Sequence, residues 1–356
     1  MEENEKIRVA ITMGDTNGIG PEVILKVLAA PEITELFTPV VYGSPRVLNF
    51  HRKAMSLPSL NVNVIYNTDD VNDGAVNVLD CCDDEVKIDL GEPGKAAGRA
   101  ARMALERAVA DVLAGGCDVL VTAPVNKDNI HGEDFPYTGH TDYLEAVAGK
   151  GEHALMMLTA GNLRVALATV HQPLATVPSS LSVDLLCNRL RTLDKALRRD
   201  FAIERPRIAV LALNPHAGEN GLLGDEEQQI ILPAITTVAD EDRILAFGPY
   251  AADGFFGTRR WSHFDAALAM YHDQGLAPFK AIAMGEGVNC TTGLPLVRTS
   301  PDHGTGYDIA GKGVADEQSM RSAIYTAIDV WRNRQAYDVA AANPLQRHPV
   351  EHQTEK

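Results

Sequence analysis

Short apolar runs alternate with longer amphipathic stretches along most of this 356-residue chain. Runs rich in β-branched residues are typical of buried strands, whereas apolar residues at helical spacing indicate helices. The pattern predicts strands at residues 7–12, 39–42, 118–122, 154–159, 163–170, 207–213 and 264–270. It predicts helices at residues 21–30, 95–114, 181–198, 226–239 and 316–334, with another beginning at Ser44-Pro45. The less regular residues 57–90 indicate a layer of shorter strands.

The near-regular alternation of strands and helices predicts an α/β fold with largely parallel sheets flanked by helices. A chain of 356 residues is long enough for two domains. Because no linker interrupts the pattern, we expect two intimately joined, discontinuous subdomains. The expected division puts residues 1–140 and 290–345 in one subdomain and residues 141–289 in the other.

The formal net charge of the chain is −16. A basic face is the usual footprint of a nucleic-acid-binding protein, so this balance argues against nucleic acid and against an anionic membrane surface as partners. The sequence also lacks a run of about 18 apolar residues that would span a bilayer. The five cysteines are odd in number and form no CxxC pair, which is typical of a reduced, cytoplasmic protein.

A histidine follows each of three predicted strands, at His171, His216 and His272. Ligands of open α/β sheets bind beyond the carboxyl ends of the strands, so equivalent positions there are informative. A single loop histidine is usually an ordinary surface residue. Three of them predict a shared catalytic metal, because imidazole is a common ligand of divalent metals and three protein ligands leave room for substrate. By ligand softness, three imidazoles favour Zn²⁺, Co²⁺ or Ni²⁺ over Mg²⁺.

A second group of polar residues, Lys280, Asn289 and Arg298, recurs every nine residues in an apolar, glycine-rich stretch. Lysine and arginine suit phosphate and carboxylate, and arginine binds them through a bidentate fork. Upstream, His140 and Thr141 follow a glycine where a helix is expected to begin. Thr141 can offer a backbone N–H and a hydroxyl to a ligand, although a plain helix cap explains the same pattern.

Two glycine-rich loops do not match known nucleotide motifs. Residues 14–20 lack the GxGxxG spacing of dinucleotide-binding loops. Residues 306–313 nearly fit a P-loop, but they lack its closing Ser or Thr and no strand directly precedes them. These features argue against a P-loop ATPase and leave open a phosphate or nucleotide loop lined by backbone.

Several of these motifs together resemble the 4-hydroxythreonine-4-phosphate dehydrogenase family of vitamin B6 biosynthesis. The resemblance covers about residues 9–334 and includes MGDTNGIGPE, VTAPVNK, GHTD, TVHQP, LNPHAGENGLLGDEE, YHDQGLAPFK and SPDHGTGYDIAGKG. Residues 303–313 are also similar to the coenzyme loop of isopropylmalate and isocitrate dehydrogenases, which share the family's fold.

The resemblance implies NAD⁺- or NADP⁺-dependent oxidation of 4-phosphooxy-L-threonine at C3, followed by decarboxylation to 3-amino-2-oxopropyl phosphate. It also implies one divalent metal per subunit, Zn, Co or Mg, and a homodimer with the active site at the subunit interface. In that arrangement, residues 1–140 and 290–345 form the coenzyme side, and residues 141–289 form the metal and dimer side.

By motif, the resemblance makes three histidines the metal ligands, and an interface site allows the partner chain to supply one of them. These ligands are His171, His216 and His272. The implied substrate contacts are His140, Thr141, Lys280, Asn289 and Arg298. The implied coenzyme contacts are His303, Gly304, Thr305 and Asp308. Asp253 and Asp273 are candidates for the general base, with a supporting or structural role as the alternative for each.

The chain departs from the commonest family pattern in its first loop, where Thr16-Asn17 replaces Pro-Ala after Asp15. We expect Asn17 to add an amide near the substrate carboxylate or the coenzyme. A paralogue that oxidises D-threonate or erythronate 4-phosphate is therefore an alternative. Two other classes stay open: a non-redox metal-dependent aldolase or phosphate acyltransferase, and a non-catalytic sugar-phosphate sensor.

Overall fold

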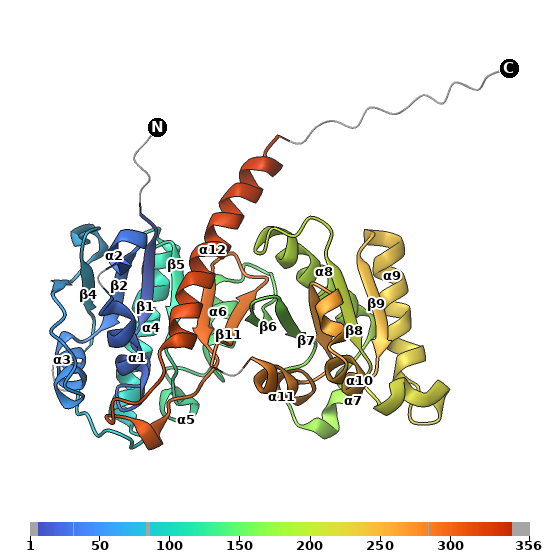
Figure 1. Cartoon of the computed structure of the whole chain (residues 1–356), viewed down its shortest axis with the longest axis horizontal. Helices are drawn as coiled ribbons and strands as arrows, with labels where there is room; N and C mark the ends of the chain where they lie inside the picture. Colours follow the sequence, from blue (N-terminus) through green and yellow to red (C-terminus); the bar gives the residue numbers. More distant parts are fainter. Residues whose placement is uncertain (1–5, 31, 83–85, 284, 344–356) are drawn as a thin grey trace.

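The computed structural model describes residues 6–30, 32–82, 86–283 and 285–343. Within these residues, twelve strands form one continuous sheet, and helices cover both of its faces (Figure 1). The strands, in chain order, are β1 Arg8–Thr12, β2 Thr38–Gly43, β3 Val62–Ile65, β4 Val76–Asp80, β5 Val119–Thr122, β6 Leu155–Ala160, β7 Leu163–Leu167, β8 Arg207–Leu211, β9 Leu245–Tyr250, β10 Ala266–Ala269, β11 Val288–Thr292 and β12 Arg298–Pro301.

The α-helices differ widely in length, and several are single turns. They are α1 Gly20–Leu28, α2 Ile33–Leu36, α3 Pro45–Ala54, α4 Lys95–Leu113, α5 Lys127–Ile130, α6 His140–Ala148, α7 Val177–Ser180, α8 Val183–Arg199, α9 Leu232–Asp242, α10 Ala252–Gly257, α11 His272–Ile282 and α12 Gln318–Ala341. Local start signals agree with these bounds. Pro21 lies in the first turn of α1, and the Ser182 hydroxyl accepts the N–H of Leu185 at the start of α8.

The strand order is β3-β4-β2-β1-β5-β12-β11-β6-β7-β10-β8-β9. Neighbours pair in parallel from β3 to β12 and again from β7 to β9. Between these two parallel parts, β11 runs antiparallel to β12 and β6, and β6 runs antiparallel to β7. The predicted α/β class with a largely parallel sheet is therefore confirmed. The antiparallel pairings in the middle of the sheet were not predicted from the sequence.

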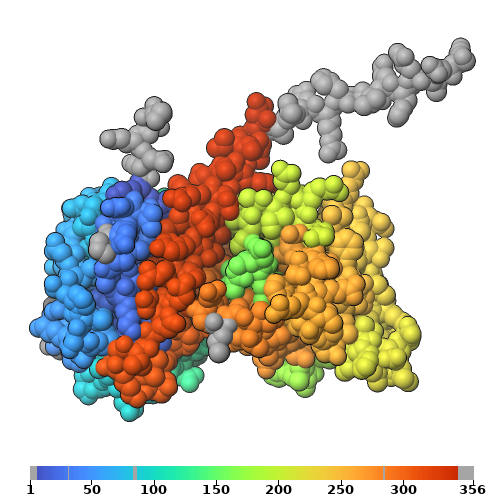
Figure 2. Space-filling view, in the orientation of Figure 1, coloured from blue at the N-terminus to red at the C-terminus, as the bar shows by residue number. Residues whose placement is uncertain are grey.

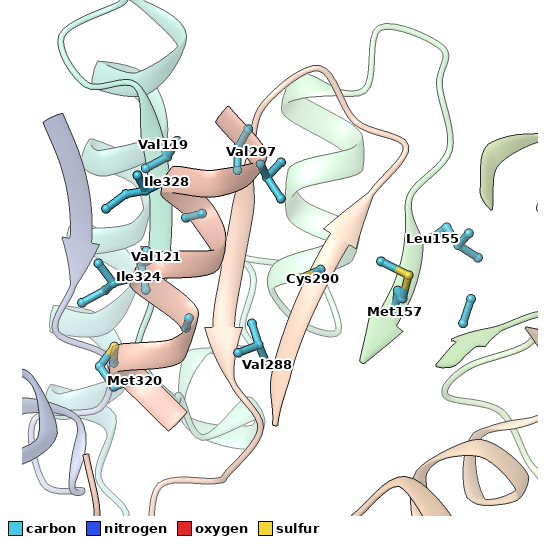
Figure 3. Packing of buried hydrophobic residues seen from close by; sticks show 14 of the residues in the cluster. Val119, Val121, Leu155, Met157, Val288, Cys290, Val297, Met320, Ile324 and Ile328 are labelled. Carbon is cyan, nitrogen blue, oxygen red and sulfur yellow. The ribbon is translucent and has the colours of Figure 1, made fainter. Parts of the chain in front are cut away.

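The core follows from side chains that alternate between the two faces of each strand. On β5, Val119 and Val121 join one buried cluster, and Leu120 joins the cluster on the opposite face. Figure 3 shows Ile324 and Ile328 of α12 beside Val119 and Val121. Burying each side chain of this kind stabilises the fold by about 1.5–3 kcal/mol, so Ile324 and Ile328 hold α12 against the sheet.

Helix α12 runs across the face of the molecule, and its last turns extend beyond the body (Figures 1 and 2). Residues 335–343 are correspondingly exposed. No helix in the described part of the chain is long and apolar enough to cross a membrane. The expected subdomain division stays a prediction, because one sheet runs through both parts and residues 1–5 and 344–345 lie outside the described residues.

Candidate functional site

Two of the three strand-end histidines lie side by side. His171 follows β7 and His272 opens α11 directly after β10, and β7 and β10 are neighbouring parallel strands. The two imidazole ring centroids are 5.6 Å apart. The pair therefore arises as the strand pattern predicted, from adjacent parallel strands that end at the same edge of the sheet.

Each imidazole of this pair has a neighbour that affects its chemistry. Nδ1 of His272 lies 2.7 Å from Oδ1 of Asp273, and this hydrogen bond leaves Nε2 of His272 available to a ligand. Partial burial, followed by the nearby Lys127 and His272, lowers the pKa of His171. A neutral ring is the form that coordinates a metal, but the Lys127 ammonium, 3.5 Å from Nε2 of His171, repels a cation at the same place.

The third histidine, His216, stands apart from the pair. It follows β8, the neighbour of β10 on the side away from β7. Strands lie about 4.8 Å apart, so β7 and β8 are separated by roughly 10 Å. No group of three His, Cys, Asp or Glu side chains within the described ranges is arranged to hold a metal. The metal site built from all three histidines therefore stays a prediction.

His216 instead lines a cavity of about 540 Å³ between β8, α10 and α11. Both candidate bases, Asp253 in α10 and Asp273 in α11, line the same cavity. Asp273 is hydrogen-bonded to His272, whereas Asp253 is exposed and has no hydrogen bond or ion pair with the described residues. Asp253 is thus the freer of the two carboxylates.

Arg298, the first residue of β12, is a buried cation, with 4% of its surface exposed. Its Nε and Nη2 donate to Oγ1 of Thr122 at 3.1 and 2.6 Å, and Nη1 donates to Oγ1 of Thr291 at 3.0 Å. Among the described residues it has no carboxylate partner. Burial lowers the pKa of Arg298 to about 10, which still leaves the guanidinium charged near neutral pH.

His140, the first residue of α6, lies against this guanidinium. Nη2 of Arg298 is 3.3 Å from Nδ1 of His140, so the imidazole accepts there and carries its hydrogen on Nε2. That Nε2 is buried and has no partner among the described residues. Burial, followed by the charges of Arg298 and Lys127, lowers the pKa of His140 well below its ordinary value. The result is a neutral ring with an unused N–H donor.

The other predicted substrate contacts lie on neighbouring elements. Asn289 of β11 is two residues from Thr291, the register partner of Arg298, so Asn289 and Arg298 share a face of the sheet. Oδ1 of Asn289 is buried without a partner among the described residues. Thr141 lies half-buried in the first turn of α6. Lys280, in the last turn of α11, is 3.2 Å from Oδ1 of Asp302, just beyond β12.

The predicted coenzyme loop packs onto the first glycine-rich loop. The N–H of Ile19 donates to the carbonyl of Thr305 at 2.9 Å, and a Cβ at Gly18 would lie 2.6 Å from the same oxygen. The two backbones therefore approach so closely at Gly18 that only glycine fits there. Of the remaining predicted contacts, Gly304 and Asp308 are exposed, and His303 has a buried Nε2 without a partner among the described residues.

The expectation that Asn17 would add an amide to the site is wrong. Its side chain is 3% exposed; Nδ2 donates to the carbonyl of Glu92 at 2.8 Å, and Oδ1 accepts the N–H of Asp89 at 3.0 Å. Both amide atoms are thus used to hold the turn at residues 89–92. The departure at Asn17 therefore places no free amide in the site, whereas Oγ1 of Thr16 is buried without a partner among the described residues.

Lys127 is a site residue that the sequence analysis did not single out. Its Nζ lies 3.5 Å from Nε2 of His171, and its Cε would be 3.6 Å from a Cβ placed on Gly139, next to His140. It has no carboxylate partner among the described residues. A signal was present, because Lys127 closes the loop after β5 just as the histidines close theirs. The ammonium joins the histidine pair to the Arg298–His140 pair.

Comparisons with known proteins identify the family of the chain. A family model described as "Pyridoxal phosphate biosynthetic protein PdxA" matches residues 35–327. A 4-hydroxythreonine-4-phosphate dehydrogenase of Bacteroides thetaiotaomicron is 52% identical over 351 residues, covering 99% of this chain and 96% of the relative.

Two solved structures extend the comparison. The 4-hydroxythreonine-4-phosphate dehydrogenase of Klebsiella pneumoniae superposes with a TM-score of 0.80 at 35% identity, covering 93% of this chain and 99% of its own. A terephthalate 1,2-cis-dihydrodiol dehydrogenase of Burkholderia xenovorans gives a TM-score of 0.60 at 26% identity, covering 91% and 98%. On the extent of the family match and the identity with its relatives, the chain belongs to the PdxA family of pyridoxal phosphate biosynthetic proteins.

Proposed function

We propose that this protein is an NAD(P)-dependent, divalent-metal-dependent 4-hydroxythreonine-4-phosphate dehydrogenase of pyridoxine 5′-phosphate biosynthesis. It oxidises 4-phosphooxy-L-threonine at C3, and the product loses CO₂ to give 3-amino-2-oxopropyl phosphate. One observation carries the proposal: Arg298, a buried guanidinium without a counter-ion in the described part of the chain, adjoins the N–H of His140, which has no partner there, and, through Lys127, a pair of imidazoles. The names of the relatives support the same substrate.

The Arg298–His140 pair is suited to an anionic group of the substrate. A buried charge without a partner is costly, so a phosphate or carboxylate that enters the site is bound favourably. The hydroxyls of Thr122 and Thr291 hold the guanidinium in place before the ligand arrives. Because its orientation is already set, less binding energy is lost in ordering the side chain, and the substrate is oriented for reaction.

The residues present suit a divalent metal in part. His171 and His272 supply two adjacent imidazoles, and the bond from His272 to Asp273 orients one of them. His216 is the proposed third ligand and, from its observed position, is proposed to bind the metal of a second protomer. We therefore also infer a homodimer with the site at its interface. When bound, Zn²⁺, Co²⁺ or Mg²⁺ would supply Lewis-acid stabilisation of negative charge on the substrate.

In the proposed reaction, the C3 hydrogen leaves as hydride to the nicotinamide ring, and the hydroxyl proton passes to a base. Asp253 is the better candidate for this base, because Asp273 already holds His272. The resulting β-keto acid loses CO₂; the electron pair of the broken C–C bond forms an enolate, which a proton then quenches. Arg298, His140 and Lys127 bind and orient the anionic groups during both steps.

The coenzyme is proposed to lie against the paired loops at residues 14–20 and 303–308. Their close backbone packing leaves Gly304 and Asp308 exposed for contacts. The proposed coenzyme side therefore consists of residues 1–140 and 290–345, and the metal and dimer side consists of residues 141–289. A reduced, cytoplasmic setting fits cysteines that form no disulfide in the described structure.

The decisive experiment supplies the purified protein with NAD⁺ or NADP⁺, each candidate metal and 4-phosphooxy-L-threonine. Reduced coenzyme and CO₂ are expected in equal amounts. D-Threonate and erythronate 4-phosphate are tested in parallel, and faster turnover of either would select the paralogue alternative. Absence of reduced coenzyme with every substrate would overturn the redox assignment and favour the aldolase, acyltransferase or sensor class.

A further inference from the structure

The loop that carries His216 has an unusual backbone. Six consecutive residues, from His216 to Gly221, have positive φ, between 45° and 96°. Only Gly218 and Gly221 among them are glycines. The left-handed region is unfavourable for residues with a Cβ, and runs of such residues are rare. A turn of this kind persists when the surrounding structure holds it, and such turns cluster at functional sites.

Two neighbouring carboxylates hold the start of this turn: Oε2 of Glu226 accepts the Asn214 side-chain amide at 2.7 Å, and Glu227 alone bonds both the backbone and the side chain of Asn214. Glu227 begins a π-helical turn, Glu227–Ile231, and is 2% exposed. Oε1 of Glu227 accepts the backbone N–H of Asn214 at 2.8 Å, and Oε2 accepts the Asn214 side-chain amide at 3.0 Å. Asn214 is two residues before His216, so the carboxylate fixes the backbone at the point where the turn begins.

The turn also packs directly onto the same carboxylate. A Cβ placed on Gly218 would lie 2.6 Å from Oε2 of Glu227 and 2.9 Å from the carbonyl oxygen of Gly224. No lysine or arginine in the described chain pairs with Glu227. Removing a carboxylate from water costs free energy, and N–H donors alone offset that cost only in part. A contribution to stability therefore does not explain why a carboxylate is buried here.

We propose that Glu227 is a positioning residue that holds His216 in the orientation required for metal binding. This inference rests on the proposed function, in which His216 is a metal ligand. Glu227 acts through Asn214 and the left-handed turn, and it need not touch the metal or the substrate. Groups that orient metal ligands typically contribute about 10–100-fold to metal affinity, which sets the size of the expected effect.

The test measures Co²⁺ affinity of the full-length, metal-free protein by isothermal titration. Glu227→Gln keeps the shape of the side chain but replaces an acceptor by an NH₂ group that faces the Asn214 amide. We expect its Kd for Co²⁺ to rise at least 10-fold. Asp225→Asn is the matched control, since it removes the same charge from an exposed position on the same segment, and its Kd should not change.

A second variant guards against a folding defect in Glu227→Gln. Gly218→Ala drives a Cβ into the carboxylate from the other side and should weaken Co²⁺ binding in the same direction. Hydrogen exchange should quicken at residues 214–224 in both variants and stay unchanged in the core strands. Exchange that quickens throughout the protein would mean a general structural role and would overturn the proposal.

His216→Ala separates this inference from the proposed function. If His216→Ala leaves the Co²⁺ affinity unchanged, His216 is not a ligand and the metal assignment itself fails. If His216→Ala weakens binding while Glu227→Gln and Gly218→Ala bind Co²⁺ like the wild type, the metal assignment stands and the positioning role of Glu227 is wrong.

Discussion

Nη2 of Arg298 lies 3.3 Å from Nδ1 of His140, although the two residues are 158 positions apart in the chain. The contact joins the first residue of β12 to the first residue of α6. It turns a buried cation and a neutral imidazole into a single anion-binding unit, and it specifies which ring nitrogen carries the hydrogen.

Replacing Arg298 by Met should impair substrate binding more than folding. The charge-assisted hydrogen bonds lost with the substrate are worth about 1.5–3 kcal/mol each, so kcat/KM should fall by at least 10-fold, mainly through KM. The melting temperature should change little, because a buried charge without a counter-ion is removed. Steady-state kinetics and a melting curve measure the two effects.

Arg334→Met is the matched control for that variant. Arg334 is equally buried, but it pairs with Asp200 at 2.7 and 2.9 Å. Its loss leaves a buried carboxylate uncompensated and should destabilise the fold by about 3–5 kcal/mol. Equal destabilisation by both substitutions, with kcat/KM of Arg298→Met retained, would remove Arg298 from the site.

Replacing Lys127 by Met should have opposite effects on substrate and metal. The ammonium is 3.5 Å from Nε2 of His171, so its removal takes away a charge that repels a divalent cation. Metal affinity should therefore rise or stay constant, while kcat/KM falls about 10-fold or more because an anion contact is lost. Lys53→Met, at an exposed position of α3, controls for net charge. Unchanged kcat/KM would exclude a substrate contact.

The separation of His216 from the His171–His272 pair predicts complementation between subunits. Inactive His171→Ala and His216→Ala proteins should regain activity when they are unfolded together and refolded as mixed dimers. A mixed dimer then contains one site with all three histidines, if the site takes His216 from the second protomer. Each variant refolded alone is the control. A mixture that stays inactive, although mixed dimers form, would mean that one chain supplies all three ligands.

The buried His51 predicts a pH dependence of stability. His51 is 0% exposed, Nε2 bonds the carbonyl of Thr16 at 2.7 Å, and burial lowers the pKa of the ring. Below the unfolded-state pKa of about 6.5, the unfolded chain binds a proton that the folded ring refuses, so stability falls as pH falls. Above that pH the His51 ring is neutral in both the folded and the unfolded protein, so it no longer makes stability depend on pH.

The measurement for His51 is denaturant unfolding of the wild type and His51→Gln between pH 5 and 8. Glutamine can donate to Thr16 but does not titrate. The stability difference between the two proteins should shift with pH only below about 6.5, by at most about 1.4 kcal/mol per pH unit. A difference that is constant across the range would show that folding leaves the pKa of His51 unchanged and would contradict the prediction.

Much of the fold could be predicted from the sequence because its strands are buried and flanked by clear helices. The elements that were missed are short or interrupted. Helix α11 contains Gly275 and Pro278, and β9 contains Gly248-Pro249, so neither has an uninterrupted apolar period. Strands β11 and β12 are stabilised by their central place in the sheet, which is a tertiary effect.

The candidate site, like the fold, has parts that could be predicted from the sequence and parts that could not. The neighbouring histidines His171 and His272 could be predicted, because both directly follow strands and those strands are adjacent. The Arg298–His140 contact could not be derived from spacing, since it depends on where β12 enters the sheet. Asn17 is the reverse case, a site residue expected from the sequence that the structure uses elsewhere. Its side-chain amide bonds the backbone at residues 89–92.

The place of β12 also has a consequence for synthesis of the chain. It lies between β5 and β11, in the middle of the sheet, yet it is the last strand to be made. The edge of β6 has no neighbour on that side until β11 has been made, and the edge of β5 has none until β12, at about residue 301, has left the ribosome. Open strand edges are sites of wrong pairing and aggregation. Nascent chains of this protein therefore need protection until almost the whole sequence has been translated.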